Sequence, residues 1–332
     1  MDKAKWTSLC RRRNFLALVL GFGLLYGLMS SGFISMQYQG IIITIGIYVL
    51  LAASLNLTTG VLGELVLGHA GFMSIGAYTA ALFTMHMDLP ALVEFPLALL
   101  LGGALAAVCG GRIGIPALRL RGDYLAIVTL GFGEIIRVVF QNLSFTGGGR
   151  GLYGIDEYTT FPWVFWIAAL SVAVMYAMIG TRQGRAILSL RENEIAAEAV
   201  GVPGTRYKVL AFTISSFFAG VAGGLYAHYI TVLDPATFDF NMSIEILVMV
   251  VLGGMGSFTG SVLAAVVLTL LPELLRDLAD YRMLIYSVVL VLMMILRPQG
   301  LLGKREFSLS RLWERLTAML KKPVPAGGKG EE

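Results

Sequence analysis

The chain alternates between long apolar stretches and short polar connections. Several stretches of about 20 residues carry few or no charges, which is enough for a helix to cross the hydrocarbon of a bilayer. The pattern predicts an all-α fold, a polytopic transmembrane helical bundle with about eight to ten membrane segments, some of them broken by glycine or re-entrant. The predicted spans are residues 15–34, 41–57, 62–85, 91–115, 124–141, 161–180, 209–230, 244–271 and 283–296.

Glycine interrupts the span predicted at 244–271. Gly253, Gly254, Gly256 and Gly260 follow one another within eight residues, and each costs about 1 kcal/mol relative to alanine inside a helix. Non-helical backbone at membrane depth is tolerated only where protein or a water-filled path satisfies it. The segment therefore predicts two short helices, entering and returning, with a break that marks a translocation path or a tight protein contact.

A similar break is predicted early in the chain, at 60–64 and 68–71. Two glycine-interrupted segments in separate halves point to a transport site between them, although no residue-level repeat is detectable. Small-residue spacings, Gly220 with Gly224 and Gly256 with Gly260, predict close helix contacts of the ordinary bundle kind.

Lysine and arginine are distributed as expected for a membrane protein with both termini in the cytoplasm. Basic residues mark 1–14, 112–121, 182–208 and the tail as cytoplasmic, whereas the alternate connections carry mainly aspartate and glutamate. We expect a basic cytoplasmic N-terminus over 1–14, a transmembrane domain over 15–303 with a cytoplasmic loop at 181–208, and a cytoplasmic tail over 304–332 that is disordered at its end.

Composition supports a membrane protein and narrows the alternatives. The chain is 57% hydrophobic and 14% charged, against about 25% charged in soluble domains, and its mean hydropathy is +0.77. The net charge of +4 comes from basic residues at the ends of apolar segments, which argues against nucleic acid as a partner. Arg12 and Arg13 resemble a twin-arginine export signal, but an uncleaved first span is favoured because no small-residue cleavage site follows.

Catalytic and metal-binding patterns are missing from the sequence. His69, His86 and His228 have no metal-ligand spacing, and neither a nucleophile elbow nor a phosphate-binding Gly-x-x-x-x-Gly-Lys loop occurs. We therefore expect no enzyme activity, cofactor or metal. If ATP drives the protein, another subunit hydrolyses it.

Four ionisable residues fall inside apolar stretches: Glu64, His69, Glu134 and Arg137. A charge at membrane depth costs about 2.5–3.5 kcal/mol on insertion scales, so it normally faces the bundle interior with a partner. Glu134 and Arg137 are three positions apart, close enough to pair on one helix face. These residues predict either the polar lining of a solute path, together with Gly253, Gly254 and Gly256, or a structural ion pair that fixes packing.

The cytoplasmic segment at 184–202 is the most informative part of the chain. Strong helix formers cover 192–200, Gly201 is placed as a C-cap and Pro203 follows. An apolar stripe runs along this predicted helix, which is too short to be stable alone and should dock onto something. The alternative is a surface loop that covers its own bundle. The stripe consists of Ile195, Ala196, Ala199 and Val200.

This segment resembles the coupling loop of ABC-importer permeases, whose short helix sits in a cleft of the ATPase. Further stretches resemble the branched-chain amino acid permease family, specifically its longer subunit type. These stretches are 65–72, 76–78, 118–124, 146–152, 227–229, 243–247 and 297–303.

The resemblance implies a bacterial inner-membrane subunit that imports leucine, isoleucine and valine. Its implied partners are a second homologous permease in a heterodimer, two cytoplasmic ABC ATPases, a periplasmic or extracellular solute-binding protein and the lipid bilayer. Ala197 resembles the small contact residue of the family. The residues implied in ATPase coupling are Arg191, Glu192, Glu194, Ala196, Ala197 and Gly201.

Other functions remain open at the level of the sequence. Permeases for urea, short amides or simple sugars share the transport class. A stand-alone channel or secondary transporter would need no ATPase, and a membrane-embedded enzyme is disfavoured by the lack of clustered catalytic groups.

Overall fold

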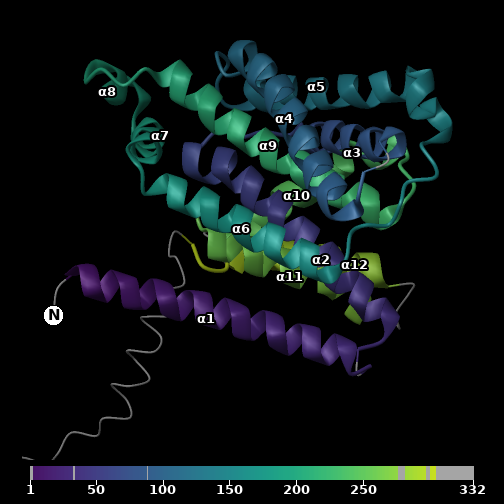
Figure 1. The fold of residues 1–332 in the computed structure, drawn as a ribbon. Helices are drawn as coiled ribbons and strands as arrows, with labels where there is room; N and C mark the ends of the chain where they lie inside the picture. The colour runs from purple at the N-terminus through teal and green to yellow at the C-terminus, as the bar shows by residue number, and fades with distance from the viewer. Residues whose placement is uncertain (1–2, 33, 88, 276–280, 297–299, 304–332) are drawn as a thin grey trace, which may run out of the picture. The chain divides into compact units, whose positions relative to one another are not determined.

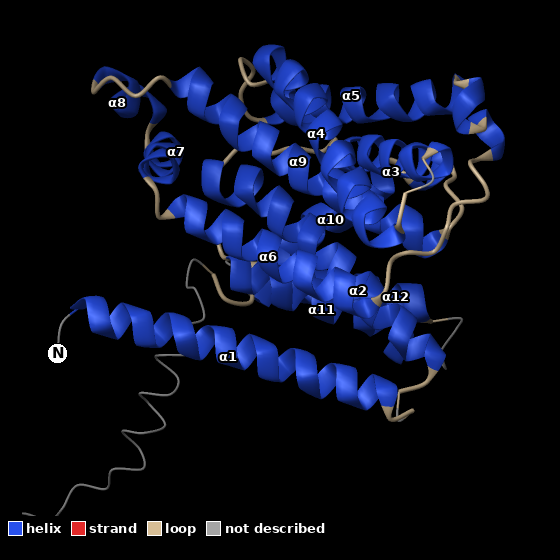
Figure 2. Cartoon of the chain, viewed as in Figure 1, coloured by secondary structure: helices blue, strands red, loops and turns tan. Residues whose placement is uncertain are grey.

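All regular elements of the described chain are helical (Figure 2). The computed structural model describes residues 3–32, 34–87, 89–275, 281–296 and 300–303. The α-helices are α1 (Lys3–Ser30), α2 (Met36–Asn56), α3 (His69–His86), α4 (Ala91–Ala117), α5 (Asp123–Asn142), α6 (Phe161–Ile179), α7 (Arg182–Glu192), α8 (Glu194–Ala199), α9 (Gly204–Ile230), α10 (Phe240–Gly253), α11 (Phe258–Leu274) and α12 (Arg282–Leu296) (Figure 1). The predicted all-α bundle is confirmed.

The chain divides into two compact units, one of residues 1–33 with 306–332 and one of residues 34–305. In the first unit the structure describes α1, whose apolar part is Leu18–Ser30. This helix begins at Lys3, so the basic stretch belongs to the same helix as the predicted first span. The predicted tail at 304–332 lies outside the described residues.

Four helical stretches of the second unit are long and apolar enough to cross a membrane: Met36–Leu62, Ala91–Ala117, Phe161–Ile179 and Gly204–Ile230. Shorter apolar helices, α10 and α11, accompany them. The span predicted at 62–85 is wrong at its start, because α3 begins only at His69. Glycine in a left-handed conformation at Gly63 (φ 86°) ends the preceding helical turn.

Glycine allows α3, α4 and α9 to pack backbone against backbone. A Cβ atom on Gly76 would lie 2.1 Å from the carbonyl oxygen of Gly220, and one on Gly223 would lie 1.9 Å from that of Met73. Such approaches suit helices in lipid, where packing rather than water exclusion drives association. The predicted Gly220–Gly224 face is thus confirmed as a helix contact, with Gly224 against Leu99 of α4.

The predicted glycine break near 254 is confirmed. Helix α10 ends at Gly253 and α11 begins at Phe258. Between them Gly254 (φ 108°) and Gly256 (φ 92°) adopt backbone conformations that favour glycine. The Ser257 hydroxyl accepts a hydrogen bond from the Gly260 N–H (3.1 Å), which caps α11. Gly256 lies in the turn, so Gly256 and Gly260 do not form one helix face as their spacing suggested.

A pair of glycine-to-alanine variants tests this packing. We expect Gly223→Ala to lower the thermal unfolding midpoint in detergent, because its methyl group would force α3 and α9 apart at a typical overpacking cost of about 1–3 kcal/mol. The control is Gly131→Ala in α5, where a Cβ atom meets nothing within 4 Å and helix propensity should add up to about 1 kcal/mol. Equal midpoints for the two variants would contradict the packing.

Candidate functional site

The segment between α6 and α9 folds as two short helices rather than one. The predicted helix over 192–200 is wrong at Asn193, whose extended backbone (φ −159°) separates α7 from α8. Its side-chain oxygen accepts a hydrogen bond from the Ala196 N–H (3.0 Å), so this residue caps α8 instead of continuing α7. Gly201, with φ 88°, ends the segment as predicted.

The apolar stripe of α8 faces away from the protein. Ile195 is 74% exposed and Val200 81% exposed, and Ala196 and Ala199 are exposed too. The stripe therefore does not cover the chain's own bundle. Ala197, the residue that resembles the family's contact position, is buried within the chain.

The charged residues around α8 point in different directions. Glu192 is exposed, whereas Arg191 lies against one glycine of each helix break. The first break is residues 57–68, between α2 and α3, and the second is residues 254–257, between α10 and α11. A Cβ atom on Gly63 would lie 3.1 Å from the Cγ of Arg191, and one on Gly256 would lie 2.8 Å from its Nη1. The long side chain of Arg191 thus occupies space that glycine leaves open.

Glu194 and Glu64 meet at a lysine. The ammonium of Lys208, in the first turns of α9, lies 2.6 Å from Glu64 Oε1 and 2.9 Å from Glu194 Oε1. The Lys208 side chain is 5% exposed, and Arg121 approaches Glu194 from outside at 3.5 Å. Glu64 therefore lies beside α8, on the non-helical stretch that follows Gly63.

The two helix breaks lie against each other. The Gly256 N–H donates to the Asn56 side-chain oxygen (2.8 Å), and a Cβ atom on Gly60 would lie 2.2 Å from the Gly256 nitrogen. Residues 57–62 form a π-helix. This form is rare, and where it occurs it is frequently at a functional site. Thr59 Oγ1 within this π-helix and Asn56 Nδ2 just before it are buried and have no hydrogen-bond partner among the described residues.

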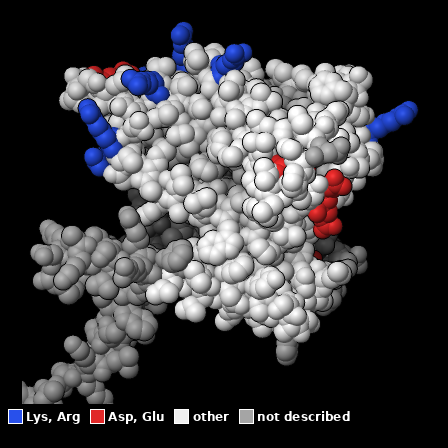
Figure 3. All heavy atoms as spheres, in the orientation of Figure 1, with Lys and Arg blue, Asp and Glu red and all other residues white. Residues whose placement is uncertain are grey.

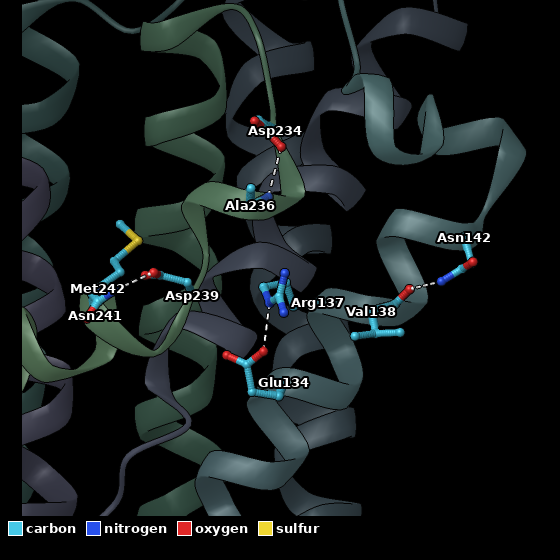
Figure 4. Close-up of polar contacts among 9 residues, drawn as sticks. All are labelled: Glu134, Arg137, Val138, Asn142, Asp234, Ala236, Asp239, Asn241 and Met242. Carbon is cyan, nitrogen blue, oxygen red and sulfur yellow. Dashed lines mark hydrogen bonds and ion pairs between the residues drawn. The ribbon is translucent and has the colours of Figure 1, made fainter.

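The remaining candidates occupy separate places. His69 is buried, and its Nε2 lies 2.8 Å from the Ser54 hydroxyl, so it joins α3 to α2. Glu134 and Arg137 pair on α5 as predicted, with Nε and Oε2 2.7 Å apart and side chains 31% and 24% exposed. Figure 4 shows that the carboxylate of Asp239, the N-cap of α10, points away from this pair and accepts a hydrogen bond from the Met242 N–H (3.0 Å).

Sequence reasoning missed the roles of Lys208 and Asn56. It used Lys208 only as a marker of the cytoplasmic side, and it passed over Asn56 within an apolar run. The available signals were a lysine in the first turns of a long apolar helix and an amide at the end of another. Their partners lie 144 and 200 positions away, which no local pattern reveals.

Comparison with known proteins shows the family. A family model described as "Branched-chain amino acid transport system / permease component" matches residues 37–297. The high-affinity branched-chain amino acid transport system permease protein LivM of Salmonella typhimurium is 42% identical over 291 residues, covering 77% of this chain and 68% of that protein. LivH of the same organism is 26% identical over 82% of this chain and 96% of that protein, and the ribose import permease protein RbsC of Escherichia coli is 26% identical over 65% and 71%. The chain belongs to the branched-chain amino acid transport permease family.

Proposed function

We propose that this chain is the membrane-spanning permease subunit of an ATP-driven importer for branched-chain amino acids. The observation that carries the proposal is the family match, which covers nearly all of α2 to α12. Residues of the predicted coupling segment, the helix breaks and the intramembrane ion pair all lie inside the matched range. Urea, short amides or other small solutes are the alternative cargo.

The importer requires partners that this chain does not supply. The sequence holds no phosphate-binding Gly-x-x-x-x-Gly-Lys loop, so two cytoplasmic ABC ATPases would hydrolyse ATP. A second homologous permease would complete the membrane domain, and a solute-binding protein would deliver the amino acid. The exposed apolar stripe of α8 supports a protein partner at this end of the bundle, because Ile195 and Val200 gain about 1.5–3 kcal/mol each on full burial.

The charge distribution supports placing α7 and α8 in the cytoplasm. In Figure 3 most of the visible lysine and arginine side chains gather at the end of the bundle that carries α7 and α8, and the broad middle of the face is uncharged. Positive residues remain on the cytoplasmic side of membrane proteins. With α8 inside, the multi-pass chain sits in the bacterial inner membrane with both termini in the cytoplasm.

The face of α5 that carries Glu134 and Arg137 is the best-supported part of the solute path. Glu134 lies eight residues and Arg137 five residues before the end of α5 at Asn142, and the pair is partly exposed. Lipid would penalise exposed charge at that depth, so water or the partner permease must cover this face. A path with few strong polar groups suits a zwitterion with an aliphatic side chain, since tight binding would slow its release.

The docking surface on α8 supplies the first test of the function. We expect Ile195→Asp combined with Val200→Asp to weaken ATPase co-purification by about tenfold or more, because two apolar anchors are lost. Binding-protein-dependent leucine uptake into proteoliposomes should fall with it, while the two permeases still co-purify. The control is Tyr153→Asp, a similarly exposed residue outside the α7–α8 segment.

Three results, from that experiment and from the same uptake assay with this chain alone or with urea, would contradict the proposal. Unchanged ATPase association would remove α8 as the docking site. Vanadate-insensitive uptake by this chain alone would indicate a channel or secondary transporter. Uptake of urea in place of leucine would reassign the cargo.

A second test separates a path-lining pair from a structural pair at Glu134 and Arg137. Arg137→Met strands a carboxylate in the membrane and should lower the unfolding midpoint. Adding Glu134→Gln should restore the midpoint without restoring leucine uptake if the pair lines the path. Normal uptake by the double variant, at normal expression, would show that the pair only fixes packing.

A further inference from the structure

The coupling helix α8 is attached to the membrane domain through a buried cation. Lys208 Nζ contacts one carboxylate on α8, Glu194, and one within the first helix break, Glu64. Because Lys208 itself belongs to α9, three elements meet at one ammonium group, and Glu64 is 144 positions from Lys208 in the sequence. Both contacts are within 3 Å, and the lysine is almost completely shielded from water.

Such a group resists separation. Moving α8 alone would separate Glu194 from Lys208 and from Arg121 and leave the buried Lys208 with a single partner, and loss of compensation for a buried charge is unfavourable. Both ion pairs stay intact only if α8, the first turns of α9 that carry Lys208 and the stretch after Gly63 move together. The geometry thus favours joint motion over independent motion.

A second link runs parallel to the first. Arg191, at the end of α7, lies against Gly63 of the first break and Gly256 of the second. The Gly256 N–H is held in turn by Asn56 (2.8 Å). The α7–α8 segment is therefore attached to both breaks, through Lys208 to the first and through Arg191 to each.

The first break has the features of an element that rearranges. Its backbone is a π-helix followed by six non-helical residues, and in the part of the chain that the structure describes Asn56 Nδ2 and Thr59 Oγ1 are buried without hydrogen-bond partners. Buried polar atoms that lack hydrogen bonds are costly, so an arrangement in which these two atoms gain partners would recover that cost. A ligand can select that arrangement only through differential affinity for the two states.

We propose that Lys208 is a positioning residue that transmits movement of α8 to the first helix break (residues 57–68), in which Glu64 lies. It holds Glu194 and Glu64 on one ammonium, so that nucleotide-driven displacement of α8 displaces the break rather than the loop around it. This inference rests on the proposed function, since it assigns the connection between the ATPase docking surface and the membrane path.

Two independent cuts of the link test the proposal in the assembled importer with its binding protein. Glu194→Ala removes the contact at α8, together with the weaker and exposed Arg121–Glu194 pair, while the buried Lys208–Glu64 pair remains. Lys208→Met combined with Glu64→Gln removes the cation and the carboxylate that it would strand, and so should fold better than Lys208→Met alone. The matched control is Glu198→Ala, the same substitution four residues further along α8 at an exposed position.

Leucine uptake per ATP hydrolysed, ATPase co-purification and the unfolding midpoint are measured for each variant. We expect both cuts to lower uptake per ATP by about tenfold, within the roughly 5–150-fold range of coupling between sites, while the ATPases remain bound and active. Glu198→Ala should keep the same leucine uptake per ATP hydrolysed as the unaltered complex.

Normal uptake per ATP in the Glu194→Ala variant would overturn the proposal, and so would loss of ATPase binding, because Glu194 would then contact the ATPase directly. The same fall in leucine uptake per ATP in Glu198→Ala would also overturn it, because coupling would then depend on any charge on α8 and not on the contact with Lys208. Failure of the unaltered complex to transport leucine with ATP would instead overturn the proposed function, and this inference with it.

Discussion

The structure depends on satisfying backbone polar groups where helices are interrupted inside an apolar bundle. In hydrocarbon no water is available to these groups, so each break must find protein partners. Here the two breaks satisfy each other, through the Gly256 N–H and the Asn56 side chain (2.8 Å). The carbonyls at the end of α10 are satisfied by the chain's last described residues, since the Leu301 N–H donates to Leu252 O (2.7 Å) and the Leu302 N–H to Gly253 O (3.3 Å).

This mutual dependence divides the bundle into a stiff part and an adaptable part. The helices α3, α4 and α9 meet through glycine with backbones nearly touching, which leaves little room for change. The breaks instead combine a π-helix, left-handed glycines and buried polar atoms without partners. The coupling segment contacts the adaptable part through Arg191. Through Lys208 it contacts both parts, because Lys208 is a residue of α9 and also binds Glu64 in the first break. We therefore expect a displacement of α8 to be transmitted to the helix breaks.

Most of the helices could be predicted from the sequence because apolar length and glycine density are local properties. The glycine break between α10 and α11 is a clear case. The split at Asn193 was missed, because helix propensity over 192–200 outweighed the tendency of an asparagine side chain to cap. The burial of Ala197 was also not predictable, since a six-residue helix offers too little periodicity to define its inner face. The contacts of Lys208 with Glu64 and of Asn56 with Gly256 join residues 144 and 200 positions apart, and no local pattern encodes them.

The central claim, that α8 and the helix breaks move as one body, is tested most directly by distances between spin labels. The labels would be placed at Ala199 and Met255, both exposed, in an assembled importer whose Cys10 and Cys109 are replaced by serine. A second pair, Met255 and Tyr153, reports movement of the second break, between α10 and α11, relative to a site outside the α7–α8 segment. The account predicts that a non-hydrolysable ATP analogue leaves the Ala199–Met255 distance unchanged while the Met255–Tyr153 distance shifts. A shift in the Ala199–Met255 distance with Met255–Tyr153 unchanged would show that α8 moves without the break, and would contradict the account.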